Sequence, residues 1–196
     1  MTGRETGNRL AGNGAMLSFV VQAHEGARLH YDLRLEVKGR WVSWAVPKGP
    51  SLDPRAHRFA FRTPDHALDM GPLEGTLRSA EGRGESLVLV WDEGTYQPLL
   101  PAGVSLEGAL QRGVLKLRLE GQRLRGLWKL VHWKRTPPSP ECWVLTKLPD
   151  RHVVAGHEAG SEMRSVRTGR SFEEMASALG SPPGPTPGTL EAYGET

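Results

Sequence analysis

The chain has 196 residues, which suits one domain with a substantial core and is short for two full domains. Its 25 basic and 22 acidic residues give a formal net charge of only +3, so composition alone does not mark a nucleic-acid binder. The single cysteine, Cys142, excludes an internal disulfide, and no apolar run approaches the roughly 18 residues of a membrane span. We therefore expect a soluble, cytoplasmic protein that is a monomer.

The composition predicts four successive segments. Residues 1–16 are rich in Gly, Asn, Thr and Arg without apolar periodicity, which is typical of a mobile arm. Residues 17–150 carry the expected domain, and residues 151–180 form a C-terminal extension with a short helix. Residues 181–196 contain several proline steps and few apolar residues, so we expect a disordered tail.

Short β-branched or alternating runs, separated by turn signals, predict about eight strands. Strands of this number and length favour a mainly β fold, a small closed or nearly closed β barrel with short flanking helices. Lys38-Gly39 predicts a tight hairpin turn because glycine tolerates positive φ, and Glu93-Gly94 and Glu120-Gly121 predict the same. The expected strands cover residues 18–22, 30–37, 40–46, 58–63, 87–92, 114–119, 127–132 and 143–147.

Two short helices are expected beside these strands. Residues 106–112 follow Ser105, which can cap the free amides, and precede Gly113, which can end the helix. Residues 172–179 follow Ser171, and Glu174 stands at capping-box spacing from it.

The second expected strand carries the residues with the clearest chemical potential. Because side chains alternate along a strand, His30, Asp32 and Arg34 share one face at steps of about 7 Å, while the apolar residues between them face the core. Two histidines and one carboxylate can hold one face of a divalent ion and leave positions for water or substrate. His24 would complete that set, and Arg34 could bind a phosphate beside the metal as a two-pronged donor.

The pattern alone leaves other interpretations open. An alternating polar strand face is often merely solvated in an antiparallel sheet. A facial triad of a non-haem iron oxygenase is another reading, with His66 as the second histidine.

Longer segments resemble one known family. Residues 19–36 and 43–52 are similar to the signature of the 3′-phosphoesterase domain of bacterial DNA ligase D. The similarity continues through residues 65–69, 73–75, 90–96 and 124–128, and covers about residues 18–178. This long contiguous match argues against the oxygenase.

The resemblance implies a small β barrel whose metal, typically manganese, is held by His24, His30 and Asp32. It also implies that Arg34 and His66 are the catalytic residues that hold the scissile phosphate. Gln22, Lys48 and Arg58 fall on further positions in or around the active site of the family.

The resemblance further implies removal of a 3′-terminal ribonucleotide from a DNA or mixed primer strand, followed by removal of the remaining 3′-phosphate. The partners would then be DNA or RNA–DNA 3′ ends, with a DNA ligase, polymerase or end-binding protein as candidates.

Three departures from the family pattern bear on activity. Pro64 replaces a glutamate, and Met70 replaces a tyrosine that offers a hydroxyl to the phosphate, which a thioether cannot do. The loop at residues 78–85 also differs. A non-catalytic or partly degenerate module that binds nucleic-acid ends is therefore the alternative to an active enzyme.

Overall fold

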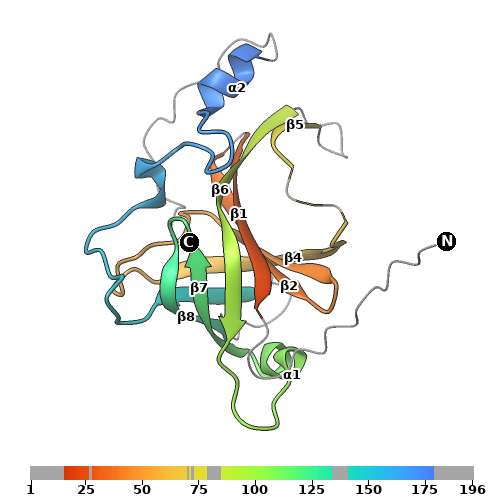
Figure 1. Ribbon diagram of the computed structural model, residues 1–196, viewed down its shortest axis with the longest axis vertical. Helices are drawn as coiled ribbons and strands as arrows, with labels where there is room; N and C mark the ends of the chain where they lie inside the picture. The colour runs from red at the N-terminus through yellow and green to blue at the C-terminus, as the bar shows by residue number, and fades with distance from the viewer. Residues whose placement is uncertain are drawn as a thin grey trace, which may run out of the picture.

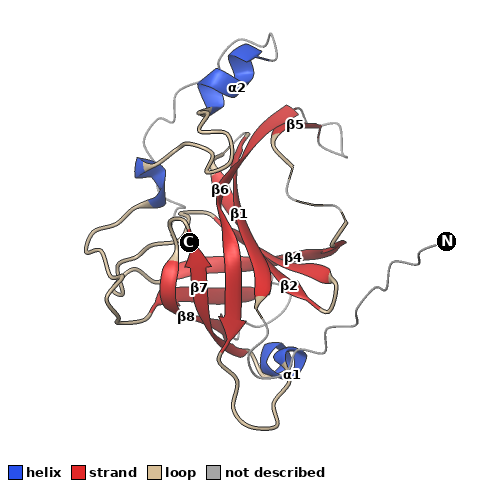
Figure 2. Cartoon of the chain, in the orientation of Figure 1, coloured by secondary structure: helices blue, strands red, loops and turns tan. Residues whose placement is uncertain are grey.

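The computed structural model describes residues 16–26, 28–69, 71, 73–78, 85–133 and 141–178. These residues form nine strands and short helices, whose arrangement can be followed in Figure 1 and Figure 2. In chain order the elements are β1 (Leu17–Glu25), β2 (His30–Val37), β3 (Arg40–Val46), β4 (Arg58–Ala67), β5 (Gly75–Arg78), β6 (Glu85–Pro98), α1 (Leu106–Gln111), β7 (Val114–Gly121), β8 (Arg125–Trp133), β9 (Cys142–Lys147), a 3₁₀ turn (Ala159–Ser161) and α2 (Phe172–Ala178).

Eight of the strands close into an antiparallel barrel, as the sequence predicted. They are hydrogen-bonded in the order β1-β2-β3-β4-β9-β8-β7-β6, and β6 returns to pair with β1. The ninth strand, β5, pairs only with the first residues of β6 and lies outside the ring. Figure 1 shows β1 and β6 side by side, with α1 near one end of the pair and α2 near the other, beside β5.

The barrel interior explains why these segments form strands. Alternate residues of β2 are buried, and the core cluster that they join includes the fully buried rings of Trp44, Trp91 and Trp128. Such large aromatic side chains supply much of the apolar area that a small barrel buries. Cys142 is also buried, as expected for a small side chain. Trp133 differs from the other tryptophans because 56% of it is exposed.

The turn predictions have mixed outcomes. Lys38 and Gly39 have φ values of 47° and 73°, so the tight hairpin turn is confirmed. The turn at Glu93-Gly94 is wrong because Gly94 lies inside β6, between Phe19 of β1 and Gly121 of β7. A Cβ at Gly94 would collide with the backbone oxygen of Glu120, so this glycine permits close strand approach.

Other boundaries also differ from the sequence expectation. The turn expected at Glu120-Gly121 instead lies at residues 122–124, because both residues belong to the end of β7 and β8 begins at Arg125. β5 is not among the expected strands, because its four residues are too few for a clear alternating pattern. Both helices are confirmed at residues 106–111 and 172–178, with the side chain of Ser105 accepting a hydrogen bond from the amide of Gly108.

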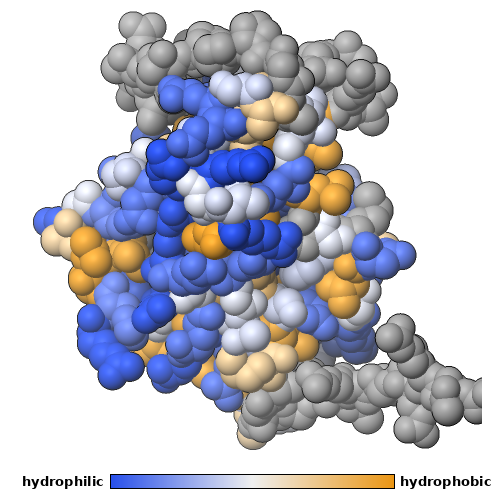
Figure 3. Space-filling view, turned by 45° about the horizontal axis from the view of Figure 1, so that its top comes forward, coloured by the Kyte–Doolittle hydropathy of each residue, from blue (hydrophilic) through white to orange (hydrophobic). Residues whose placement is uncertain are grey.

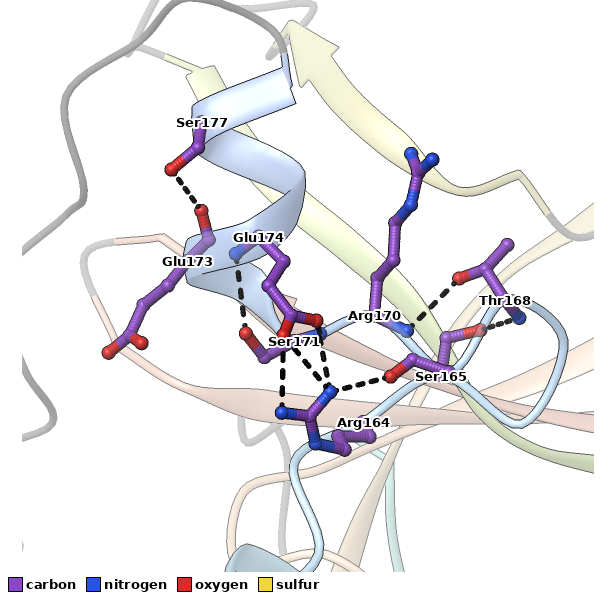
Figure 4. A network of polar contacts seen from close by, with 9 residues as sticks. Arg164, Ser165, Thr168, Arg170, Ser171, Glu173, Glu174 and Ser177 are labelled. Carbon is purple, nitrogen blue, oxygen red and sulfur yellow. Dashed lines mark hydrogen bonds and ion pairs between the residues drawn. The ribbon is translucent and has the colours of Figure 1, made fainter.

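The segment after β9 packs onto the barrel. Ala159, Phe172 and Met175 join the main core cluster. At the start of α2, the amide of Ser171 donates to Glu174 and the amide of Glu174 donates to the Ser171 hydroxyl, which confirms the capping box. Figure 4 shows Glu174 between Ser171 and the guanidinium of Arg164, so the helix start is fastened to the preceding chain.

Several expectations lie outside the described residues. These are the mobile arm apart from Met16, the tail at residues 181–196, Met70, and most of the divergent loop at residues 78–85. Among the residues that are described, no helix has the length and apolar character needed to cross a membrane.

A buried cation fixes the end of β9. Nζ of Lys147 donates to the backbone oxygens of Leu127, at 3.1 Å, and Leu148, at 2.9 Å, and lies 2.7 Å from the carboxylate of Asp150. The same ammonium lies 5.7 Å from the centroid of the Trp128 ring. Because this lysine is fully buried, Asp150 supplies a counter-charge that the interior would otherwise lack.

This pair makes a prediction about stability and pH. Burial opposes ionisation of Asp150, but hydrogen bonds from Lys147 and from the amides of Leu127 and His152 lower its pKa to about 2. The stability that a depressed pKa contributes is present above the unfolded pKa of about 3.9 and is lost as pH falls toward 2. Asp150→Asn should therefore lower the free energy of unfolding at neutral pH by about 2–4 kcal/mol. It should also flatten the loss of stability between about pH 4 and 2. Urea unfolding of both proteins across this range checks the prediction, and equally steep acid curves would contradict it.

Candidate metal and phosphate site

The β1–β2 hairpin brings the three predicted metal ligands together on the outer face of the barrel. Its register pairs His24 with His30 and Gln22 with Asp32. Nε2 of His24 lies 3.2 Å from Oδ2 of Asp32, and Nε2 of His30 lies 3.9 Å from Oδ1. One ligand atom from each of the three side chains lies within 4.8 Å of the other two. Three donor atoms this close together could hold one metal ion.

The two imidazoles are held in compatible orientations. Their rings are stacked, with centroids 5.0 Å apart and an interplanar angle of 26°. Nδ1 of His30 lies 3.2 Å from the backbone oxygen of Arg28, a contact in which Nδ1–H donates. That tautomer leaves Nε2 of His30 with a free lone pair toward Asp32, as metal-binding histidines generally require.

The chemistry of this donor set fits a divalent metal. Burial opposes ionisation of Asp32, but the contact with His24 and the charges of His24, His30 and Arg34 lower its pKa below the usual value. The carboxylate is therefore charged at neutral pH. Nε2 of His24 is buried and faces Oδ2 of Asp32 at 3.2 Å, so an ion bound to Asp32 would also lie within reach of this nitrogen.

Arg34 forms an ion pair with the same carboxylate. Its Nη2 lies 3.6 Å from Oδ2 of Asp32, and the residue stands two positions further along β2. Cross-strand pairing places it between Val20 of β1 and Ser43 of β3. A guanidinium beside a charged ligand set, rather than in open solvent, is well placed to bind an anion that also contacts the metal.

His66 lies on the same sheet but two strands away. It is in β4 and pairs with Trp41 of β3. Its Nδ1 is buried without a partner among the described residues. Pro64 precedes it at the irregularity in the β3–β4 register, between the pairs Ser43–Thr63 and Trp41–His66. A proline is tolerated at such a bulge, so Pro64 does not remove His66 from the sheet.

Gln22 links the ligand set to the chain that follows β4. It is almost fully buried, pairs with Asp32 and donates from Nε2 to the backbone oxygen of Leu73 at 2.7 Å. Glu74, the next residue, accepts from the amide of Val90 and from the hydroxyl of Ser165. Gln22 therefore helps to hold the segment before β5 against the strands that carry the site.

The two remaining predicted residues have different surroundings. Lys48 is exposed just beyond the end of β3. Arg58 is buried, and its Nη2 lies 2.6 Å from Oε2 of Glu158. No described contact joins Arg58 to the ligand set, and it alternates with the outward residue Phe59 along β4.

Sequence reasoning missed two polar residues on this face. The hydroxyl of Ser43 and the indole nitrogen of Trp41 are buried without partners in the described part of the chain. Ser43 stands directly opposite Arg34, and Trp41 opposite His66. The alternation of β3 could have placed both on the polar face, but only the register shows which residues they adjoin. Among the described residues of β1–β4, the buried side-chain atoms without a hydrogen-bond partner are Gln22 Oε1, His24 Nε2, Arg34 Nε, Trp41 Nε1, Ser43 Oγ, Trp44 Nε1, Arg58 Nε and His66 Nδ1.

Comparison with known proteins identifies the family of the chain. The model of the DNA ligase D 3′-phosphoesterase domain matches residues 22–132, more than half of the chain. The chain belongs to this family. The matched region contains every predicted ligand and phosphate-binding residue, and the family is one of phosphoesterases.

Several longer relatives contain a similar segment. The multifunctional non-homologous end joining protein LigD of Pseudomonas aeruginosa is 40% identical over 136 residues, which are 69% of this chain and 15% of the relative. The corresponding DNA repair protein of Mycobacterium tuberculosis is 36% identical over 114 residues, 58% of this chain and 14% of the relative. That of Mycolicibacterium smegmatis is 33% identical over 137 residues, 68% of this chain and 17% of the relative. The chain thus spans a small part of each relative.

The ligand set can be tested without any assay of activity. We predict that this chain binds one divalent transition metal, and that His24→Ala, His30→Ala and Asp32→Ala each remove it. Each change takes away one of the ligands that an open metal site needs. His57→Ala is the matched control, because His57 is exposed and contacts Thr146 instead. Metal analysis after dialysis checks the prediction. Full occupancy in both His30→Ala and Asp32→Ala would overturn it.

Proposed function

We propose that the chain is a metal-dependent 3′-end-healing phosphoesterase that acts in DNA break repair. It would remove 3′-terminal ribonucleotides and 3′-phosphates from DNA or mixed primer strands. The observation that carries this proposal is that His24, His30 and Arg34 all lie beside the carboxylate of Asp32. Membership of a 3′-phosphoesterase family and relatives named for non-homologous end joining support the choice of substrate.

Two imidazoles and one carboxylate suit a first-row divalent ion, and manganese is the metal that the family resemblance favours. When bound, the ion would polarise a phosphoryl oxygen or activate water. The protein side chains would complete the site. Arg34 would neutralise a second phosphate oxygen through two parallel hydrogen bonds, and the charge on Asp32 keeps its guanidinium beside the ligand set.

His66 would act from the other side of the phosphate. A phosphate over β3 can contact both Arg34 on β2 and His66 on β4, because those strands flank β3 in the sheet. His66 would orient the phosphate or give a proton to the leaving oxygen. The buried hydroxyl of Ser43, between the two strands, would offer a further hydrogen bond.

The other predicted contacts would act at the margins of this site. Gln22 would position Asp32 and the segment at Leu73, and Lys48 would attract the nucleic-acid backbone. Arg58 remains a prediction of the family resemblance, and its described partner is Glu158. We propose DNA or RNA–DNA 3′ ends as substrates, with a separate ligase, polymerase or end-binding protein as partner. The setting would be the cytoplasm and the protein a monomer.

The second candidate is a module that binds nucleic-acid ends without turning them over. Pro64 is the described feature that favours it, because proline fixes φ and removes a backbone donor two residues before His66. The exposed position of Pro64 at a register irregularity weakens this candidate, because the ladder needs no donor there.

The proposed reaction predicts an extendable primer as the product and a lower rate when Arg34 is replaced. Incubation with manganese and a labelled primer-template that ends in one ribonucleotide should give a primer that a polymerase can extend. Arg34→Ala should slow this reaction by roughly tenfold to a hundredfold, because a hydrogen bond to a charged group is worth about 1.5–3 kcal/mol. Arg34→Lys should recover only part of the rate, since an ammonium cannot make the two-pronged contact.

Arg112→Ala is the matched control, because Arg112 is an exposed arginine beside α1, outside the proposed site. It should retain the wild-type rate. Tight binding of the recessed end without any product, in manganese and in other divalent metals, would contradict the enzyme and support the non-catalytic binding module. Equal rates for wild type and Arg34→Ala would remove Arg34 from the mechanism.

A further inference from the structure

A row of outward side chains leads from the proposed metal site to an aromatic pair on β4. Asp32 pairs with Ala45 of β3, and Ala45 pairs with Phe61 of β4. Phe59 lies two residues before Phe61 and therefore projects from the same face of the sheet. The ligand Asp32 and the ring of Phe61 thus stand in one cross-strand row.

The aromatic pair is open to solvent. Phe59 is 56% exposed and Phe61 is partly exposed, whereas Ala60 between them is fully buried in the core. Figure 3 shows one face of the molecule on which apolar atoms appear in small patches among hydrophilic ones. A single exposed ring is ordinary on a protein surface, so the exposure of Phe59 does not by itself indicate a ligand. The evidence for a ligand is instead the position of Phe59 near the proposed metal site.

The strand between the rings and the ligands carries small side chains. Ala45 and Ser43 are the outward residues of β3 at this point, with Asp32 and Arg34 on one side and Phe61 and Thr63 on the other. Two strand spacings amount to roughly 10 Å between β2 and β4. A nucleotide is long enough to bridge that span, with its phosphate at the ligands and its base against the rings.

Positive charge adjoins the same end of β3. Lys48 is exposed and stands two residues after Val46, which pairs with Tyr31 next to the ligand His30. Exposed aromatic rings beside a cationic side chain are the combination by which proteins hold nucleic-acid strands without reading their sequence.

We propose that Phe59 and Phe61 form a stacking surface for the base of the nucleoside whose 3′ oxygen carries the phosphate at the metal site. This inference rests on the proposed function and names the part of the substrate that the site recognises beyond the phosphate. The terminal base of a 3′-phosphate end has one face with no neighbouring base, and that face would meet the rings. Stacking of this kind accepts every base, so the surface would select nucleic-acid ends over small phosphate esters.

Fluorescence binding tests the stacking surface without requiring catalysis. The probe is a primer-template with a 3′-phosphate and 2-aminopurine as the last nucleoside, mixed with the manganese-loaded full chain in a stopped-flow instrument so that binding is read before turnover. Stacking on the rings should quench the probe in wild type. Phe59→Ala should remove most of the quenching and weaken binding about tenfold. Phe59→Tyr should restore both, because it keeps the ring. Because Phe59 is more than half exposed, its truncation should leave the fold intact.

A second substrate separates base stacking from backbone contact. With an abasic last nucleoside, wild type should bind as weakly as Phe59→Ala, and the substitution should cause no further loss. Val114→Ala is the control, because Val114 is 44% exposed on β7, outside the rows that carry the site. Unchanged quenching and affinity in both Phe59→Ala and Phe61→Ala, or an equal loss on the abasic substrate, would overturn the inference. Quenching without any product in the manganese assay would instead refute only the proposed reaction.

Discussion

The antiparallel pairing of β1 with β2 is the constraint on which the site depends. The ligands His24, His30 and Asp32 come from two strands, and the observed register points all three side chains to the outer face with His24 directly opposite His30. A slip by one residue would turn Asp32 into the apolar barrel and bring Leu33 to the surface, at a large cost in buried charge. The hydrophobic alternation of β2 therefore fixes the metal site while it fills the core.

Neighbouring elements hold this hairpin in place from both sides. β1 pairs along its whole length with β6, which closes the barrel, and β3 supports β2 on the other edge. Gln22 joins the site to Leu73, and Glu74 then joins that segment to β6 and to Ser165. The segment before β5 and the C-terminal segment thus contact the strands beside the ligand set, and rigid support of this kind preserves ligand geometry.

Local patterns predicted what depends on neighbours in sequence. The alternation at His30–Val37, the Lys38-Gly39 turn and the capping box at Ser171 all follow from short-range rules, and the structure confirms each. Gly94 was misread because its role depends on the backbone of β7, far away in the chain. The positions of Ser43 and Trp41 beside Arg34 and His66, and the pairing of Arg58 with Glu158, likewise arise from tertiary register that no local pattern contains.

The most direct test of the central claim is to locate the metal and the phosphate in a crystal of the full chain. Crystals grown with manganese and an oligonucleotide that ends in a 3′-phosphate would be measured at the manganese absorption edge. We expect one anomalous peak in contact with Nε2 of His24, Nε2 of His30 and the carboxylate of Asp32, with the phosphate between it and Arg34. A manganese peak elsewhere on the barrel, or a phosphate bound away from Arg34, would contradict it.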